Sequence, residues 1–296
     1  MYKKALLSAA VAGSMLAVAP AAFAAPIVTD IVSVIDESGS MGGEQAWLSG
    51  MISQLDGGLS AAAGADPLSV QYGLVGFGAS IAAVRRLDMD TTTAAIDDWG
   101  TATQMGPASG NLVASGATED GYLGVNEALS YSGQAGGLRN IILITDEDRD
   151  NTDFSLTYAS VLSALQSADA LLNAVLNVDI RCGDGSTALG IDADGNGYQA
   201  DGAGSYNTCS GASILSGAGS SIADYADMAT ATGGAVWDLN QLRVGGLTAT
   251  SFTDAFVDLK VRETVVDPDV PVPEPATLFL FAGGLGMAGW QLRKKS

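Results

Sequence analysis

The sequence contains no histidine, and this absence removes several classes of enzyme. None of its 296 residues can act as the imidazole base of a Ser-His-Asp or Cys-His site, and the usual histidine ligands of zinc are also missing. Lysine is almost as scarce, because the only one outside the two ends of the chain is Lys260, in a segment with helical periodicity. The sequence therefore disfavours Schiff-base and Ser-Lys chemistry as well.

Basic residues in general are few. The chain has 13 Lys and Arg against 33 Asp and Glu, which gives a formal net charge of −20. Five of the 13 basic residues lie at the ends: Lys3, Lys4, Arg293, Lys294 and Lys295. Since phosphate contacts need a basic patch, we expect no nucleic-acid partner. An acidic surface instead suits solubility and divalent cations.

The first 24 residues have the three parts of a secretory signal peptide. Lys3 and Lys4 precede an uncharged stretch rich in Ala, Leu and Val, which ends in Ala22-Phe23-Ala24. We therefore predict cleavage after residue 24 and export of the remainder.

The C-terminal end has three parts too. Residues 263–275 contain four of the eight prolines and are predicted to be an extended linker. Residues 276–296 are predicted to be a membrane helix, at the short limit for crossing a bilayer, with a basic tail that stays in the cytoplasm. The domain before the linker would then lie outside the cytoplasm.

This end resembles the PEP-CTERM sorting signal of Gram-negative bacteria. The resemblance is carried by Pro273-Glu274-Pro275, the apolar stretch and the basic terminus, in that order. It implies cleavage by an exosortase-type membrane protease and passage to the cell surface or extracellular matrix. A plain membrane anchor is the alternative.

Residues 25–262 alternate apolar runs with segments of helical periodicity. This alternation predicts an α/β domain with a doubly wound, mostly parallel sheet and helices on both faces. The expected strands are 30–36, 69–78, its hairpin partner 81–89, 139–146, 172–180 and 235–239; the expected helices are 44–62, 91–100, 118–132, 155–168, 221–234 and 250–261.

Residues 182–216 interrupt the alternation and are rich in Gly, Asp and Ser. Cys182 and Cys209, the only cysteines, are an even pair in the exported part, so we predict a disulfide that pins this insert. Two free buried thiols are the alternative. The segment "DADGNGY" (192–198) has the alternating oxygens of an EF-hand loop, but Ala203 stands where a bidentate Glu is needed. We prefer a hairpin turn at Asn-Gly.

The segment "DESGSM" (36–41) places Asp36, Ser38 and Ser40 at every second position after the first predicted strand. Doubly wound sheets bind ligands beyond the carboxyl ends of their strands. If this loop is extended, the three oxygen side chains converge there, and oxygen is the ligand that Mg²⁺ prefers. The alternative is that one of them caps the helix that follows.

The same segment resembles the Asp-x-Ser-x-Ser motif of the von Willebrand factor type A (VWA) family, which forms a metal-ion-dependent adhesion site (MIDAS). The likeness extends over about residues 29–262 and implies a Rossmann-like fold, from which the insert departs. The family completes its site with a Thr and an Asp, which the resemblance assigns to Thr118 and Asp146. Neighbouring residues that compete with Thr118 are Thr101, Thr103 and Ser115. The implied cofactor is Mg²⁺, with Mn²⁺ or Ca²⁺ as alternatives.

The resemblance implies a surface adhesion module that is not an enzyme. Its metal would bind an acidic group of a protein or an extracellular polysaccharide. The alternative is a metal-dependent hydrolase, because Asp146-x-Asp148 also resembles the nucleophile loop of haloacid-dehalogenase-type phosphatases. A third interpretation is a vestigial site in a matrix-filling protein.

Overall fold

The computed structural model describes residues 26–265. The predicted signal peptide, the linker beyond residue 265 and the predicted membrane helix lie outside these residues. Among the helices of residues 26–265, none combines the length and the apolar character needed to cross a membrane.

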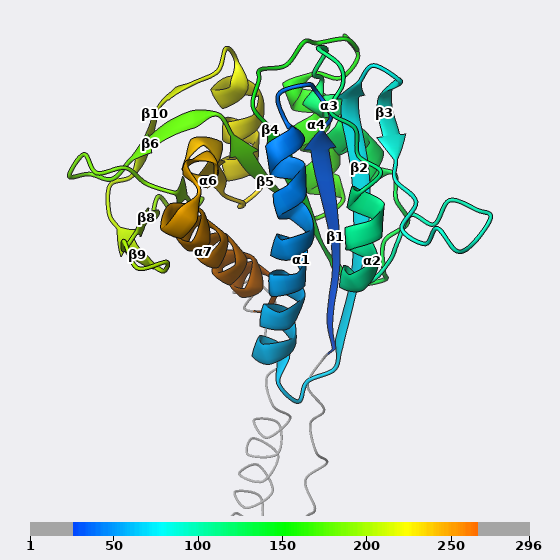
Figure 1. Ribbon diagram of the computed structural model, residues 1–296, viewed down its shortest axis with the longest axis horizontal. Helices are drawn as coiled ribbons and strands as arrows, with labels where there is room; N and C mark the ends of the chain where they lie inside the picture. Colours follow the sequence, from blue (N-terminus) through cyan, green and yellow to red (C-terminus); the bar gives the residue numbers. More distant parts are fainter. Residues whose placement is uncertain (1–25, 266–296) are drawn as a thin grey trace, which may run out of the picture. The chain divides into compact units, whose positions relative to one another are not determined.

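The domain is built on a nine-stranded sheet in the order β3-β2-β1-β4-β5-β11-β7-β8-β9 (Figure 1). The parallel strands are β2 (Leu68–Ala79), β1 (Ile27–Asp36), β4 (Leu138–Thr145), β5 (Ala170–Leu176) and β11 (Val236–Asp238). β3 (Ala82–Arg86) returns antiparallel to β2, as its predicted hairpin partner. The expected mostly parallel sheet is confirmed.

Helices cover both faces of this sheet. One face carries α1 (Gly42–Ala63), α2 (Ala102–Ser109), α6 (Leu239–Val244) and α7 (Gly246–Val265). The other carries α3 (Gly121–Leu129), α4 (Tyr158–Ser167), η1 (Ile222–Ala226) and α5 (Asp227–Ala231). Because strand side chains alternate, Ile31 and Ile35 of β1 enter the first core and Val32 and Val34 the second. The doubly wound architecture is therefore confirmed.

The helix predicted at 91–100 is wrong, because these residues form turns. Asp90 Oδ1 accepts a hydrogen bond from Thr92 N (3.1 Å), and Asp88 Oδ1 accepts one from Asp97 N (3.1 Å). These side chains give the backbone local partners that compete with helical ones. The helix begins only after Thr101, which forms a capping box with Gln104.

The strand predicted at 172–180 is divided in two. β5 ends at Leu176, and β6 (Val178–Arg181) leaves the main sheet to pair antiparallel with β10 (Ser213–Gly217). At the other end of the domain, α7 continues past residue 262 to Val265.

The insert is more ordered than a loop. Its strands β7 (Gly190–Ile191), β8 (Gly197–Ala200) and β9 (Tyr206–Cys209) extend the main sheet beyond β11, and each is antiparallel to the strand before it in the sheet. Between β7 and β8, Asp192 Oδ1 accepts a hydrogen bond from Asn196 N (2.8 Å), so this carboxylate stabilises a hairpin turn. The positive φ of 83° belongs to Gly195, whereas the glycine of the predicted Asn-Gly turn, Gly197, already begins β8.

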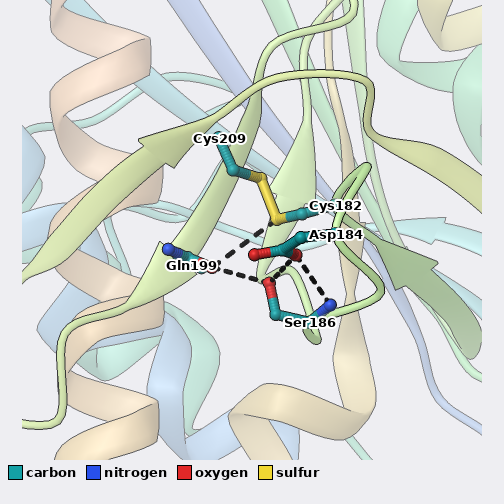
Figure 2. Close-up of a disulfide and its surroundings, with 5 residues drawn as sticks. All are labelled: Cys182, Asp184, Ser186, Gln199 and Cys209. Atoms are coloured by element: carbon teal, nitrogen blue, oxygen red, sulfur yellow. Dashed lines mark hydrogen bonds between the residues drawn. A yellow bond between two sulfur atoms is a disulfide. The ribbon is translucent and has the colours of Figure 1, made fainter.

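The predicted disulfide is confirmed (Figure 2). Cys182 follows β6 and Cys209 ends β9, with their Cα atoms 5.8 Å apart. Beside it, Ser186 Oγ donates a hydrogen bond to Gln199 Oε1 of β8 (2.8 Å). The disulfide therefore ties the start of the insert to the outermost strand of the sheet.

Candidate metal centre

Several loops meet at the carboxyl end of β1, where the arrowhead of this strand ends in Figure 1. Ser115 N donates to Glu37 O (2.8 Å), and Ser80 N donates to Ser115 O (2.6 Å). Gly116 has a φ of 145°, and a Cβ there would lie only 1.9 Å from Gly78 O. Glycine at 116 therefore allows the loops to pack backbone against backbone.

Asp36 lies at the bottom of this site with no exposed surface. Its Oδ1 accepts a hydrogen bond from Ser38 N (2.7 Å), and its Oδ2 accepts one from Thr145 Oγ1 of β4 (2.8 Å). Burial raises the pKa of Asp36 to about 6, although these hydrogen bonds act in the opposite direction. Thr145 was not among the predicted site residues.

Ser38, Ser40 and Asp146 form a chain of polar contacts above Asp36. The two hydroxyl oxygens lie 3.1 Å apart, and Ser40 Oγ donates to Asp146 Oδ1 (2.9 Å). The residue that caps α1 is Met41, and no side chain bonds to this helix end. The alternative that these residues merely cap the helix is therefore wrong.

Thr118, the remaining predicted ligand, lies at the rim of the site with an exposed side chain. A Cβ on Gly78 would lie 3.3 Å from both the Thr118 carbonyl oxygen and Asp36 Oδ1, so the second loop and the Asp36 carboxylate both pack beside Gly78. Of the competing residues, Thr101 caps α2, and Ser115 Oγ lies 3.1 Å from Ser80 Oγ.

Glu119, which follows Thr118, was not predicted and is only 3% exposed. Its N–H donates to Asp150 Oδ2 (2.8 Å), and Asp150 N donates to its carbonyl oxygen (2.8 Å). Burial, together with the charges of Asp36, Glu147 and Asp150, raises the pKa of Glu119 to about 7. A buried carboxyl group that the sequence did not predict therefore lies near Asp36.

Asp120 organises the acidic loop after β4. Its Oδ1 pairs with Arg149 Nε (2.6 Å), and its Oδ2 accepts hydrogen bonds from Thr152 N (2.8 Å) and Asp153 N (3.2 Å). The Arg149 guanidinium also lies over the Tyr122 ring of α3, 4.1 Å from its centroid. These contacts fix the loop that begins with Asp146.

Arg243 of α6 reaches the site from the other side. Its Nη2 donates to Asp146 Oδ2 (2.8 Å), and its Nε pairs with Glu44 of α1. Both oxygens of Asp146 are therefore in contact with protein groups, Ser40 on one side and Arg243 on the other. No sequence pattern connects positions 243 and 146.

The donors suit a hard divalent cation. They are carboxylate and hydroxyl oxygens, as Mg²⁺, Mn²⁺ and Ca²⁺ prefer. Within residues 26–265, no group of three or more Asp, Glu or Cys side chains has a metal-holding arrangement, so the hydroxyls of Ser38 and Ser40 are essential to the candidate set. Among the same residues, neither Asp36 nor Glu119 has an ion-pair partner. A cation would offset this buried charge.

The C-terminal end and the domain before it are similar to different known proteins. Residues 271–295 match the PEP-CTERM protein-sorting motif. The C-terminus carries this sorting motif. No curated protein matches the chain.

Solved structures resemble parts of this chain at low identity. The pilus adhesin SpaC from Lactobacillus rhamnosus GG aligns with 80% of this chain and 30% of its own (13% identity, TM-score 0.45). A von Willebrand factor type A structure from Catenulispora acidiphila aligns with 50% of this chain and 33% of its own (18% identity, TM-score 0.32). Proximal thread matrix protein 1 from the mussel byssus aligns with 51% and 38% (15% identity, TM-score 0.36). The aligned region thus spans less than two fifths of each of these structures.

Proposed function

We propose that this protein is an exported, cell-surface binding module that holds a divalent cation, Mg²⁺ in the first instance, and binds acidic groups through it. The proposed ligands are Asp36, Ser38, Ser40, Thr118 and Asp146. The observation that carries the proposal is the contact chain from Ser38 through Ser40 to Asp146, made by hydroxyls that cap no helix.

The donor set explains why the partner should be acidic. Neutral hydroxyls contribute no charge, and Arg243 balances part of the Asp146 charge. A bound divalent ion would supply a local positive centre on a chain whose net charge is −20. Ser40 is exposed whereas Asp36 and Ser38 are buried, so the loops leave the solvent side open to a carboxylate of a protein or polysaccharide.

Exposed apolar side chains on neighbouring loops support a role in binding. Ile81 lies in the turn after β2, Phe154 in the loop after β4, and Val244 at the end of α6; their exposed fractions are 66%, 81% and 65%. Each segment leaves the carboxyl end of a strand in the sheet. Such residues could add apolar contacts around an acidic anchor.

The PEP-CTERM motif at 271–295 supports the proposed location. The predicted order of events is export, anchoring through the C-terminal helix, and cleavage by an exosortase-type protease. The domain would end at the cell surface or in the extracellular matrix of a Gram-negative bacterium.

The first test is thermal unfolding of residues 26–265, which belong to one compact unit, with the disulfide intact. Midpoints are measured in chelator and then across Mg²⁺, Mn²⁺ and Ca²⁺ concentrations. Binding to the folded state alone raises the free energy of unfolding by about 2.7 kcal/mol when the ion is present at 100 times its Kd. We expect a concentration-dependent rise that Asp36→Ala abolishes.

The matched control is Asp66→Ala, which removes an exposed carboxylate between α1 and β2, at the opposite edge of the sheet. It should keep the full response to the ion. A wild-type midpoint that no ion changes would overturn the proposal.

The second test measures binding to immobilised poly-L-glutamate and alginate, in Mg²⁺ and in chelator. Binding that requires the ion and Asp36, but not Asp66, would support recognition of acidic groups. If the ion binds and stabilises the domain but promotes binding to neither polymer, the metal has a structural role and these partner classes are excluded.

A further inference from the structure

Lys260 is a buried lysine that takes no part in the candidate metal centre. Only 1% of the residue is exposed, and it is the only lysine within residues 26–265. It lies on α7, with its Nζ 5.6 Å from the centre of the Phe256 ring. A lysine is almost never fully buried, because its ammonium group loses its hydration there. Its position therefore needs a chemical or structural reason.

Two buried asparagines lie on the sheet face that α7 covers. Asn173 of β5 and Asn140 of β4 each stand two residues before a side chain of the core on that face, Val175 and Ile142, and alternate side chains of a strand share a face. Asn173 Nδ2 donates a hydrogen bond to Asn140 Oδ1 (2.7 Å), while Asn140 Nδ2 has no hydrogen-bond partner among the described residues. Two amide groups are thus held side by side in an apolar core.

Glu263 connects the lysine with Asn173. Its Oε2 accepts hydrogen bonds from Lys260 Nζ and from Asn173 Nδ2, the second at 3.3 Å. Two atoms that bond to the same oxygen lie within about 6 Å of each other, so the amine and the amide share one small space. Within residues 26–265, Glu263 is the only hydrogen-bond partner of the Lys260 amine.

The surroundings favour attack by the amine on the amide. Burial lowers the pKa of Lys260, which favours the neutral and therefore nucleophilic amine. Asn173 Oδ1 accepts a hydrogen bond from the backbone N–H of Ala235 (2.8 Å). A fixed donor at this oxygen stabilises the negative charge that develops when a nucleophile attacks Cγ. Glu263, whose side chain is 11% exposed, contacts both nitrogens and is placed to carry protons between them.

We propose that Lys260 and Asn173 form an intramolecular isopeptide bond, with Glu263 transferring the protons. Glu263 takes one proton from the Lys260 ammonium, and the neutral amine attacks Asn173 Cγ. As the Cγ–Nδ2 bond breaks, Glu263 gives its proton to the leaving nitrogen and takes a second proton from Nζ. The products are one new amide and one molecule of ammonia, so the step needs no oxidant, metal or cofactor.

This bond would join α7 covalently to β5, the strand in the middle of the sheet. α7 is the last described element before the sorting motif at residues 271–295. A domain held at the cell surface through its C-terminus is pulled through α7. The bond would keep this helix on the sheet under such a pull.

The first measurement is the intact mass of folded residues 26–265, because release of one ammonia lowers the mass by about 17 Da. Wild type should show this loss. Lys260→Arg and Asn173→Ala should keep the full mass, because each lacks one reacting group. Glu263→Gln should also keep the full mass, since Gln does not take up the amine proton. Asn140→Ala is the matched control and should lose ammonia as wild type does.

Trypsin digestion after denaturation and reduction locates the bond. Trypsin does not cleave after a modified lysine, so the linked protein should give peptide 150–181 joined to peptide 244–262. Asn140 lies in a separate peptide, 140–149, so the digest also shows which asparagine has reacted.

A wild-type protein of full mass, from which trypsin releases peptide 244–260 with a free lysine, would overturn the proposal. The same mass loss located in peptide 182–243 would be ring closure at Asn196-Gly197 and would overturn it too. If Glu263→Gln loses ammonia as wild type does, the proton transfer assigned to Glu263 is wrong.

Discussion

Arg243 donates a hydrogen bond to Asp146, with 2.8 Å between Nη2 and Oδ2, across 97 residues of sequence. Its Nε pairs at the same time with Glu44, whose side chain is 8% exposed. One guanidinium thus connects α6 with α1 and with the loop that carries a proposed metal ligand. Arg243 balances the negative charge of Glu44 and Asp146 and would compete with the proposed metal for Asp146.

The first prediction concerns Arg243→Met. The substitution leaves Glu44 and Asp146 without their ion-pair partner, so the free energy of unfolding in chelator should fall by about 3 kcal/mol. The shift produced by Mg²⁺ should become larger, because Asp146 no longer shares its charge with Arg243. Urea unfolding with and without the ion measures both effects.

The control for this prediction is Arg181→Met. Arg181 pairs with Asp179 on the surface, where each side chain is 37% exposed, and an exposed pair contributes less than about 1 kcal/mol. A smaller ion response in Arg243→Met would show instead that Arg243 holds Asp146 in the geometry needed for the metal.

Sequence periodicity predicted the parallel core because each buried element is dominated by its own apolar pattern. The sequences of β1, β4 and α1 each show such a pattern without interruption. The Asp36 motif was recognisable because it stands at the end of one of these strands, β1. The short strands of the insert could not be predicted, because two to four residues are too few to show a period.

The candidate site was predictable only in part. Asp36, Ser38 and Ser40 lie close together in sequence, and Asp146 ends a recognisable strand. Arg243 and the burial of Glu119 depend on contacts between distant loops, which leave no local pattern. The helix predicted at residues 91–100 was wrong for a local reason. Side-chain hydrogen bonds within this segment override its helical periodicity.

The second prediction concerns the disulfide. Replacing both Cys182 and Cys209 with Ser opens a loop with a sequence separation of 27, and the chain-entropy model predicts a loss of about 3.5 kcal/mol in the free energy of unfolding. The response to the ion should not change, because β9 lies six strand spacings from β1, about 29 Å away. Unfolding in chelator and in Mg²⁺ tests both statements. A loss of the ion response would show that the insert shapes the metal centre.

The third prediction concerns Lys260, which is 1% exposed and pairs with Glu263. Burial lowers the pKa of Lys260, which means that keeping this side chain charged costs free energy in the folded state. Apart from the effect of the proposed isopeptide bond, Lys260→Met should destabilise the domain by about 3 kcal/mol, because Glu263, at 11% exposed, loses its cation. Adding Glu263→Gln should recover most of that loss, since Gln can still accept the hydrogen bond from Asn173 Nδ2 (3.3 Å). A double variant no more stable than the single one would show that the pair stabilises the fold by itself.

The last prediction concerns Asp120, which organises the loop after β4 without joining the proposed ligands. Asp120→Asn should leave the buried Arg149 without its partner and weaken the contacts to Thr152 and Asp153. We expect the free energy of unfolding in chelator to fall by about 3 kcal/mol. The affinity for Mg²⁺ should fall as well, because Asp146 begins the loosened loop, and calorimetric titration measures this.

Asp153→Asn is the control, because its side chain bonds only within the loop, to Ser155, and it should change neither quantity appreciably. If Asp120→Asn lowered stability but left Mg²⁺ affinity at the wild-type value, the order of this loop would not determine metal binding.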